Sequence, residues 1–334
     1  MADTSQRITF LSGNSLPSRK EALVLQLSDG LGNQMFQYAF ALALQKVSGH
    51  RVMLDVSWFP EYGGVLRKAT PRHFGLGVYN LSLPYVPPHY VRELVYGKGL
   101  FGQICKAWHI RRNYLRESDA RFCSTALGTM SAPMVVRGFF QKAGYAEMVR
   151  AQLLNDFSLP EEMLPDSNRE MLARIRAAGE CAVMVHIRRG DYLNPDVARV
   201  HGGCTADYYE RAESLIASRI GKPLHLFIFS DDPDWVRDNY QTKHERTLVN
   251  VNGGDVPHLD INLMRHCSHA ITANSTFSWW GAWLMNHPGA VVVSPAAVHR
   301  LCRAGKQDRG LPGLRQPVLP SGSGAGCGCP HYFR

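Results

Sequence analysis

Near its amino end the chain alternates between apolar runs and a helical pattern. Residues 22–27 form a short apolar run that predicts a buried strand, and a Gly-rich turn follows it. Apolar residues then recur at helical spacing from Met35 to Val47, and Gly49 stands where a helix typically ends. A second strand is predicted over 51–56. Together these elements predict a βαβ unit, in which the two strands are parallel.

The carboxy-terminal half shows the same alternation more regularly, whereas residues 60–150 have few clean periods. Asp232 precedes Pro233, which is the usual combination of an N-cap and a first helical residue. Strands that alternate with helices of this length predict an α/β fold with doubly wound parallel sheets. The predicted strands are 181–187, 223–229, 246–250, 269–273 and 289–293, and the predicted helices lie near 205–219, 233–240, 258–267 and 277–286.

Breaks in these patterns divide the chain. Residues 1–21 are predicted to be a polar leader, and residues 304–334, rich in Gly, Pro and Ser, a tail that adds little to the core. A polar, Pro-containing stretch at 155–178 marks a boundary. We therefore predict two α/β domains, at 22–158 and 159–303, with ligands at the carboxyl ends of their strands and in the crevice of the pair.

Composition narrows the choice of partners. The 334 residues carry a net charge of +9, which favours a nucleic acid, a membrane surface or a phosphorylated small molecule. No run approaches ~18 consecutive apolar residues, and residues 1–20 lack the apolar core of a signal peptide, so we expect a cytoplasmic protein without a transmembrane segment. The eight cysteines show no disulfide framework, and Cys327, Cys329 and His331 lack the second ligand pair of a metal site.

The first segment with candidate chemistry is the turn from Ser28 to Gln34. Gly30 and Gly32 precede a predicted helix, where exposed backbone N–H groups and the positive end of the helix suit a phosphate. The turn matches neither G-x-G-x-x-G nor a P-loop. A plain tight turn and a ligand loop therefore both remain open.

The second segment, His186-Ile-Arg-Arg-Gly-Asp-Tyr192, directly follows a predicted strand. Residues two apart on a strand share a face, so His186 and Arg188 should point the same way, while Arg189 starts on the other face. Guanidinium groups fit phosphate oxygens bidentately, so this pattern favours a polyanion site over a surface ion-pair cluster. Asp191 is predicted to orient one guanidinium by a salt bridge.

A third segment, Asn274-Ser-Thr-Phe-Ser-Trp-Trp-Gly281, also begins a helix after a strand. Its hydroxyls and helical N–H groups predict another anion cradle. Trp279 and Trp280 either pack in the core or stack on a ring, and we expect at least one in the core.

Between these two segments, Asp232-Pro-Asp234 matches the bare D-x-D pattern of metal-dependent sugar transfer. The helix-cap role explains Asp232 without a metal, and a carboxylate at a strand end can also accept hydrogen bonds from a guanine.

Four motifs, in order and spacing, resemble those of the glycosyltransferase family 11 α-1,2-fucosyltransferases, and the resemblance extends over about residues 22–300. It implies a GT-B architecture, in which two Rossmann-like domains face each other across a cleft. The motifs are Leu31-Gly-Asn-Gln-Met-Phe-Gln-Tyr-Ala-Phe40, His186-Ile-Arg-Arg-Gly-Asp-Tyr192, His201-Gly-Gly-Cys with Asp207-Tyr-Tyr209, and Asn274-Ser-Thr-Phe-Ser-Trp-Trp280.

The resemblance also implies a reaction. The donor would be GDP-β-L-fucose, the acceptor a β-galactoside glycan, and the product an α-1,2 linkage made with inversion, without a metal or another cofactor. Arg188 would hold the donor diphosphate, with His186 and Asp191 beside it. The other implied donor contacts are Gly30, Gly32, Asn33, Gln34, Arg189, Asp231, Asp232, Asn274, Ser275, Thr276 and Ser278.

Two departures from the family pattern concern acceptor choice more than the chemistry. Asp29 stands where the family often has glycine, and Gly138-Phe-Phe-Gln-Lys142 is a looser match to the family's Gly-Tyr-Trp-Gln. No motif isolates a general base, and Asp29 is a weak candidate. Two rival functions are disfavoured. A nucleic-acid-binding protein predicts basic clusters with interleaved aromatic residues; residues 108–114 come closest, but no recognised module surrounds them. A non-catalytic lectin-like protein predicts loss of Arg188 or of the Asn-Ser-Thr-Phe-Ser segment at 274–278, and both are intact.

Overall fold

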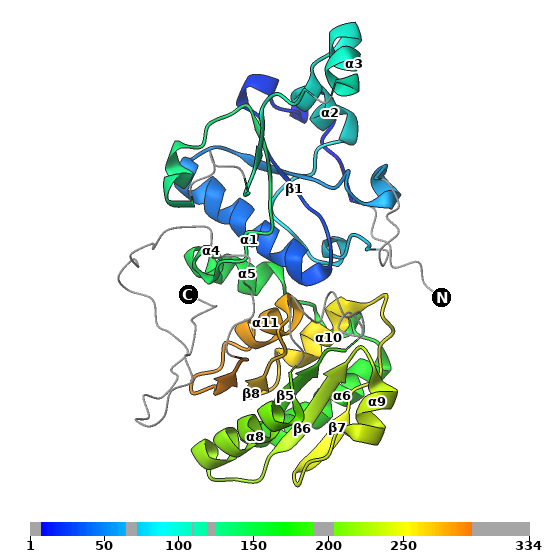
Figure 1. The fold of residues 1–334 in the computed structure, drawn as a ribbon, viewed down its shortest axis with the longest axis vertical. Coiled ribbons are helices and arrows are strands. Elements are labelled where there is room, and N and C mark those ends of the chain that lie inside the picture. Colours follow the sequence, from blue (N-terminus) through cyan, green and yellow to red (C-terminus); the bar gives the residue numbers. More distant parts are fainter. Residues whose placement is uncertain (1–7, 65–71, 109, 119–123, 190–203, 296–334) are drawn as a thin grey trace. The chain divides into compact units, whose positions relative to one another are not determined.

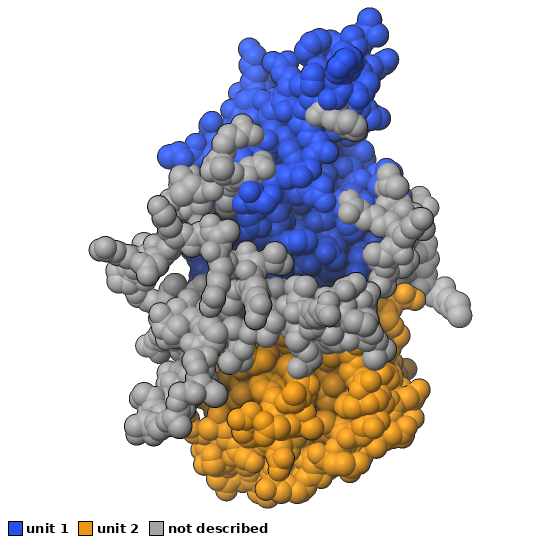
Figure 2. Space-filling view, viewed as in Figure 1, with its two compact units in different colours: residues 1–158 blue, residues 159–334 orange. Residues whose placement is uncertain are grey.

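The computed structural model describes residues 8–64, 72–108, 110–118, 124–189 and 204–295. The chain forms two compact units, residues 1–158 and 159–334 (Figure 2). The predicted tail at 304–334, the cysteine pair within it and Asp191 lie outside the described residues. Within the described ranges, no helix is both long enough and apolar enough to span a membrane.

Unit 1 is built on a four-stranded parallel sheet (Figure 1). Helix α1 links β1 to β2, and Gly49 closes it with a left-handed φ of 71°, so the predicted βαβ unit is confirmed. The remaining strands, β3 and β4, come from the region whose pattern predicted no element. The sheet order is β2-β1-β4-β3, with β1 at Leu23–Gln26, α1 at Leu31–Ser48, β2 at Val52–Asp55, β3 at Tyr114–Arg116 and β4 at Met134–Arg137.

The described part of the predicted polar leader is packed against unit 1. The N–H of Leu11 donates to the carbonyl oxygen of Tyr85 at 2.8 Å, and the Tyr90 hydroxyl donates to the carbonyl oxygen of Pro17 at 3.0 Å. Leu11 and Leu16 also contact the apolar cluster beneath α2. The prediction of a separate leader is therefore wrong for residues 8–21, because two leucines anchor a segment that is otherwise polar. The further helices of unit 1 are α2 (Pro88–Tyr96), α3 (Gly99–Ala107), α4 (Ala143–Met148) and α5 (Arg150–Asp156), and 3₁₀ turns lie at Gly13–Ser15, Arg19–Glu21, Pro60–Tyr62, Leu76–Val78 and Ser124–Thr129.

Unit 2 contains the predicted doubly wound sheet, with all five strands parallel. Its order, β7-β6-β5-β8-β9, reverses direction between β5 and β8. The α/β class with two parallel sheets is thus confirmed, and each unit holds one Rossmann-like sheet. The strands are β5 (Ala182–Ile187), β6 (His225–Ser230), β7 (Glu245–Leu248), β8 (His269–Ile271) and β9 (Val292–Val293), and the helices are α6 (Asp166–Ala178), α8 (Ala206–Ile220), α9 (Pro233–Asn239), α10 (Pro257–Met264) and α11 (Thr276–Trp283).

Two apolar clusters cover the faces of this sheet. Ile216 of α8 and Val236 of α9 pack on one face, while α6, α10 and α11 cover the other with residues such as Ile175 and Leu263. Helix α6 lies in the stretch whose polarity predicted a boundary, but its buried apolar side chains pack it on unit 2. Trp280 is fully buried, which confirms that at least one of the adjacent tryptophans packs in the core.

The packing of α11 on α10 gives a prediction about stability. A Cβ atom at Gly281 would lie 2.8 Å from the Sδ atom of Met264 and 3.0 Å from its Cβ atom. We expect Gly281→Ala to lower the free energy of unfolding by about 1–3 kcal/mol, because the neighbouring helix must move. The matched control is Gly144→Ala in α4, where nothing lies within 4 Å of the new methyl group. Urea titration of both variants should show a loss only for Gly281→Ala, and an unchanged midpoint there would contradict the tight packing.

Candidate functional site

The carboxyl ends of β5, β6 and β8 bring three predicted segments of unit 2 to one edge of its sheet. Ile187 pairs with Ser230 at the end of β6, and Val185 pairs with Ile271 at the end of β8. The loops that begin at Arg188, Asp231 and Thr272 therefore start side by side. The sheet order reverses at β5, and such a switch point is where open α/β sheets bind ligands.

Arg189 is held in place by the loop after β6. Its backbone N–H donates to Asp231 Oδ1 at 2.7 Å, and its Nε atom lies 3.3 Å from Asp232 Oδ2. Its guanidinium carbon lies 3.7 Å from the ring centre of Trp235, a cation–π contact. Asp232 also caps α9 by accepting a hydrogen bond from the N–H of Trp235 at 3.1 Å. The predicted capping role of Asp232 is confirmed, and in the described residues it is Asp232 that orients this guanidinium.

His186 is a buried histidine that precedes the two arginines at the end of β5. It is 5% exposed, and the Tyr209 hydroxyl donates to its carbonyl oxygen at 3.0 Å. Burial, together with the positive charge of Arg188, lowers the pKa of His186 to about 3. The imidazole is therefore neutral at pH 7, and its buried Nδ1 atom has no hydrogen-bond partner within the described residues.

The third segment forms the amino end of α11. Ser275 caps the helix, its Oγ atom accepting from the N–H of Phe277 at 3.2 Å. Asn274 and Thr276 are half-buried beside it. Ser278 differs from the prediction, because it is fully buried and its hydroxyl lies 3.3 Å from the carbonyl oxygen of Ala273 and 3.2 Å from that of Ser275. Ser278 thus fixes the turn, and its place in the structure gives it no surface for a direct ligand contact.

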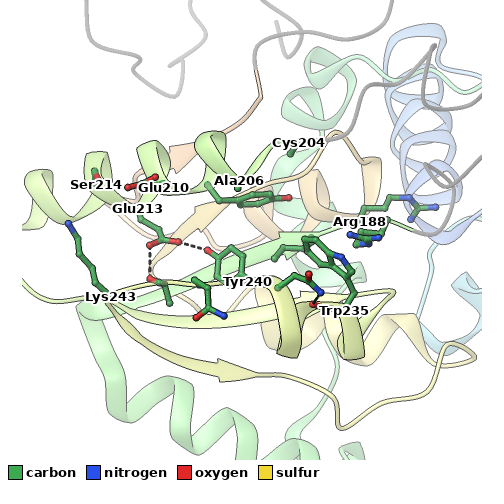
Figure 3. Close-up of a pocket in the computed structure, with 15 residues that line it drawn as sticks. Arg188, Cys204, Ala206, Glu210, Glu213, Ser214, Trp235, Tyr240 and Lys243 are labelled. Carbon is green, nitrogen blue, oxygen red and sulfur yellow. Dashed lines mark hydrogen bonds between the residues drawn. The ribbon is translucent and has the colours of Figure 1, made fainter. Parts of the chain in front are cut away.

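A hollow of about 820 Å³ runs between α8 and α9 from the two arginines (Figure 3). Arg188 and Trp235 lie at one end of it, and Lys243 lies at the other. Glu213, in the wall, is buried and accepts hydrogen bonds from the hydroxyls of Tyr240 and Thr242. Burial and the Glu213 carboxylate raise the pKa of Tyr240, which keeps the phenol protonated. The hollow is thus polar and charged at its ends, with aromatic side chains between them.

Sequence reasoning did not find most of this lining. Trp235 follows the predicted N-cap by three residues, but nothing in the pattern shows that it lies under a guanidinium. Glu213 and Tyr240 come from different elements, α8 and the loop after α9, and their contact depends on the tertiary fold. An acidic residue in the middle of the α8 pattern, where a buried position is expected, was the available signal for Glu213.

In unit 1, the loop between β1 and α1 is fastened by the glutamines of the predicted motif. Gln34 is fully buried; its Nε2 atom donates to the carbonyl oxygens of Asp29 and His73, at 2.7 and 2.9 Å, and its Oε1 atom accepts from the N–H of Gly75 at 2.9 Å. These bonds use both N–H groups of the amide and one of the two lone pairs of its oxygen. Gln34 therefore holds the loop in shape, which differs from the direct donor contact that the resemblance implied.

The same loop is joined to the loop after β4. Gln37 accepts from the N–H of Ser28 at 2.9 Å and donates to the carbonyl oxygen of Gly138 at 2.9 Å. The half-buried Asn33 accepts from Gln141 at 2.8 Å. β1 and β4 are neighbours at the point where the order of this sheet reverses, so both loops lie at its switch point.

Backbone geometry explains two features of these loops. Asp29 has a φ of 70°, a conformation that favours glycine, and its carboxylate accepts from the N–H of Gly30 at 2.8 Å. A Cβ atom at Gly138 would lie 2.5 Å from the Cβ atom of Glu117, so only glycine fits there. Nothing lies within 4 Å of a Cβ atom built on Gly30, which leaves its backbone open to approach. Gly32, the second residue of α1, is buried.

A metal site would require several ligand side chains close together in the described residues. Among them, no three His, Cys, Asp or Glu side chains gather as the ligands of a metal ion would. Asp232, from the D-x-D pattern, is engaged by Arg189 and by the cap of α9, and Asp234 pairs with Arg237 at 2.8 Å.

Comparison with known proteins assigns the family. Residues 103–310, more than half of the chain, match the model described as "Glycosyl transferase family 11". The chain belongs to this family. It is therefore a glycosyltransferase, and the predicted family is confirmed.

The glycosyltransferase has relatives in bacteria and mammals. It is 31% identical over 287 residues to the O-antigen biosynthesis glycosyltransferase WbnK of Escherichia coli. The matched region covers 80% of this chain and 92% of that protein. It is 29% identical over 279 residues to an alpha-1,2-colitosyltransferase of Escherichia coli, covering 82% and 91%. It is also 28% identical over 260 residues to the galactoside alpha-(1,2)-fucosyltransferase 1 of Rattus norvegicus, covering 76% of this chain and 61% of the rat protein.

The low pKa of His186 in the glycosyltransferase predicts a pH-dependent stability. An unfolded histidine takes up a proton near its ordinary pKa of 6.5, whereas the folded one resists it down to about 3. The stabilisation is thus complete above pH 6.5 and is lost as the pH falls toward 3. We expect His186→Asn to flatten this dependence by ~1–2 kcal/mol between pH 7 and pH 5.

Chemical denaturation at both pH values measures this change, with His50→Gln, at an exposed histidine, as the control. Should the His186 variant fold poorly, NMR titration of the wild-type imidazoles provides the test. A His186 resonance that titrates near pH 6.5 would contradict the assignment of a neutral imidazole.

Proposed function

We propose that this glycosyltransferase moves L-fucose from GDP-β-L-fucose to the 2-hydroxyl of a terminal β-galactoside, with inversion and without a metal. The observation that carries the proposal is the pair of arginines at the carboxyl end of β5, beside the amino end of α11. This arrangement suits a diphosphate, since guanidinium forks and helical N–H groups both bind phosphate oxygens. The name of the rat relative supports the sugar and the linkage.

In the proposed reaction, the main barrier is the negative charge that develops on the departing GDP. As the bond between the fucosyl C1 atom and the diphosphate oxygen breaks, the sugar gains oxocarbenium character and the GDP gains negative charge. Arg188 neutralises that charge. The amino end of α11 adds the N–H of Thr276 and the positive end of the helix dipole. Asp231 and Asp232 hold Arg189, and Asp191 is proposed to act beside them.

Nucleophilic attack also requires that the acceptor 2-hydroxyl lose its proton. His186 is too weakly basic for this step, given a pKa of about 3. Asp29 supplies a carboxylate in the first loop of unit 1, where Arg72 lies 3.7 Å from it. Proton loss late in the reaction, directly to the departing diphosphate, is the alternative to a base. A value of kcat for Asp29→Asn within about threefold of wild type would favour the late transfer.

The alternative donor is suggested by the colitosyltransferase relative, whose identity to this chain is close to that of the others. Colitose is L-fucose without its 3-hydroxyl, so the two donors share every group that the proposed diphosphate site binds. A site built to hydrogen-bond that hydroxyl rejects the analogue that lacks it by about 10⁴-fold, whereas an apolar site discriminates little.

A donor and acceptor panel tests the function. GDP-fucose and GDP-colitose are each offered with lactose, N-acetyllactosamine and type 1 and type 3 galactosides, and the product linkage is read by NMR. We expect α-1,2-linked fucose on the terminal galactose, with GDP-fucose preferred in kcat/KM by at least about tenfold. A preference for GDP-colitose would replace the donor, and absence of transfer to every galactoside would overturn the proposal.

Arg188 provides a sharper test of the mechanism. We expect Arg188→Ala to lower kcat by ~10²–10³, because the contact strengthens as the diphosphate gains charge. Arg188→Lys should not restore it, since a single ammonium does not replace the two-pronged guanidinium. The control is Arg219→Ala, at an exposed arginine near the end of α8. Activity of either Arg188 variant within about threefold of wild type would remove the diphosphate role.

Chelation tests the proposed metal independence. We expect initial rates in EDTA to stay within about twofold of the untreated enzyme, because arginine and backbone N–H groups provide the charge stabilisation. If EDTA lowers the rate and added Mg²⁺ or Mn²⁺ restores it, Asp232 and Asp234 become candidate metal ligands.

A further inference from the structure

Helix α3 and the residues that follow it expose an unusual number of large apolar side chains. Trp108 is 76% exposed, Leu100 73%, Phe101 57%, Ile110 52% and Ile104 48%. These are five of the nine large apolar residues classed as exposed in the described part of the chain. Single exposed apolar residues are ordinary, but five within eleven positions form a patch that calls for an explanation.

The patch is displayed by a firmly held backbone. The turn from α2 to α3 is tight, since a Cβ atom at Gly102 would lie 2.2 Å from the carbonyl oxygen of Gly97, the residue after α2, and Cys105 of α3 is 3% exposed. The N–H of Arg112 donates to the carbonyl oxygen of Val95 at 2.8 Å. Figure 1 shows α3 outside α2, on the side away from the sheet.

Spacing along the helix separates the two faces of α3. Leu100, Ile104 and Trp108 are four residues apart and so lie along one face. Gly102 and Cys105 are buried toward α2. The exposed apolar face is therefore the side of α3 that points away from α2, and the packing within unit 1 leaves it uncovered.

Positive charge surrounds this face. Lys98, Lys106, Arg111, Arg112 and Arg116 are all exposed, and the sequence contains no Asp or Glu between Glu93 and Glu117. The guanidinium carbon of Arg112 lies 5.9 Å from the ring centre of Phe101, so cationic and apolar groups are interleaved. The segment contributes five positive charges to a chain whose net charge is +9.

We propose that residues 98–108 and 110–116, the α3 surface, bind the face of a bilayer that contains anionic phospholipids. The apolar side chains of α3 would enter the interface, with Trp108 at headgroup depth, and the five cations would contact lipid phosphates. Each basic residue near such a surface adds to binding, and the attraction weakens with salt. The protein would lie on the membrane, since α3 is far too short to cross it.

Other occupants fit the α3 surface less well. A second copy of the chain, placed by a two-fold axis, would bring the same cations against one another. A nucleic acid would satisfy the cations but would leave the aliphatic side chains without an apolar partner. A bilayer with anionic lipids supplies both kinds of contact at once.

Vesicle flotation of the full-length protein tests the proposal. One set of vesicles contains phosphatidylcholine alone, and the other contains equal parts of phosphatidylcholine and phosphatidylglycerol. We expect at least about tenfold more protein to float with the anionic vesicles, and this excess to fall as salt is raised. Equal binding to both sets, or no binding to either, would overturn the proposal.

Two variants and their controls locate the contact. Lys106→Glu/Arg111→Glu should reduce anionic-vesicle binding by about tenfold or more, whereas Arg51→Glu/Arg219→Glu, which changes net charge equally at two exposed positions elsewhere, should not. Trp108→Ser should weaken binding severalfold, whereas Met163→Ser, 56% exposed in unit 2, should not. Equal losses in variant and control would show that net charge or general apolar exposure, and not the α3 surface, is responsible.

Two further measurements separate this proposal from others. Transfer to a soluble acceptor should be unchanged in all four variants, because the α3 surface is not part of the proposed donor site. Analytical ultracentrifugation of the wild type and of Trp108→Ser should show the same association state. A dimer that Trp108→Ser disrupts, without vesicle binding, would mean that the patch joins two copies of the chain and would overturn the membrane assignment.

Discussion

Parallel pairing of β5 with β6 on one side and β8 on the other is the constraint on which the unit 2 site depends. Parallel strands end at the same edge, so the residues after β5, β6 and β8 begin next to one another although they are far apart in sequence. Because the sheet order reverses at β5, α8 and α10 leave on opposite faces and the edge stays open. The side chains that meet at this edge then determine which kind of ligand it suits.

The two arginines at this edge have different surroundings. Arg189 is tied to Asp231, Asp232 and Trp235, and these contacts fix the course of the chain directly after β5. Its charge is balanced at close range by Asp232. Arg188 lines the hollow, and its field, together with burial, keeps His186 neutral. A neutral imidazole next to Arg188 adds no positive charge, so it does not repel the guanidinium.

The sequence pattern was sufficient to predict the regular elements and the residues that begin each loop. The βαβ unit, the five strands of unit 2 and the cap at Asp232 all follow from patterns whose range is only a few residues. The missed strands β3 and β4 are three and four residues long, too short for alternation to stand out in an aromatic, Arg-rich region. Gln34 and Ser278 lie within conspicuous motifs, but burial directs their polar atoms to backbone groups. Tertiary packing thus decides which conspicuous motif residues support their own loops, and the sequence pattern does not encode that packing.

The distribution of positive charge completes the physical picture. At the β5 edge, Arg188 and Arg189 are both partly buried, and Arg189 is held by Asp231 and Asp232, which suits a small polyanion with a defined shape. Around α3, the cations are exposed, stand on flexible side chains and share the surface with aliphatic and aromatic groups. That arrangement suits an extended, fluid anionic surface, for which orientation matters less than the number of charges. Cationic side chains therefore occur in two different settings in this chain, with different consequences. An enzyme whose acceptor glycan is anchored at a bilayer would gain from the second, because holding the catalyst at the membrane raises the local concentration of acceptor without changing the donor site.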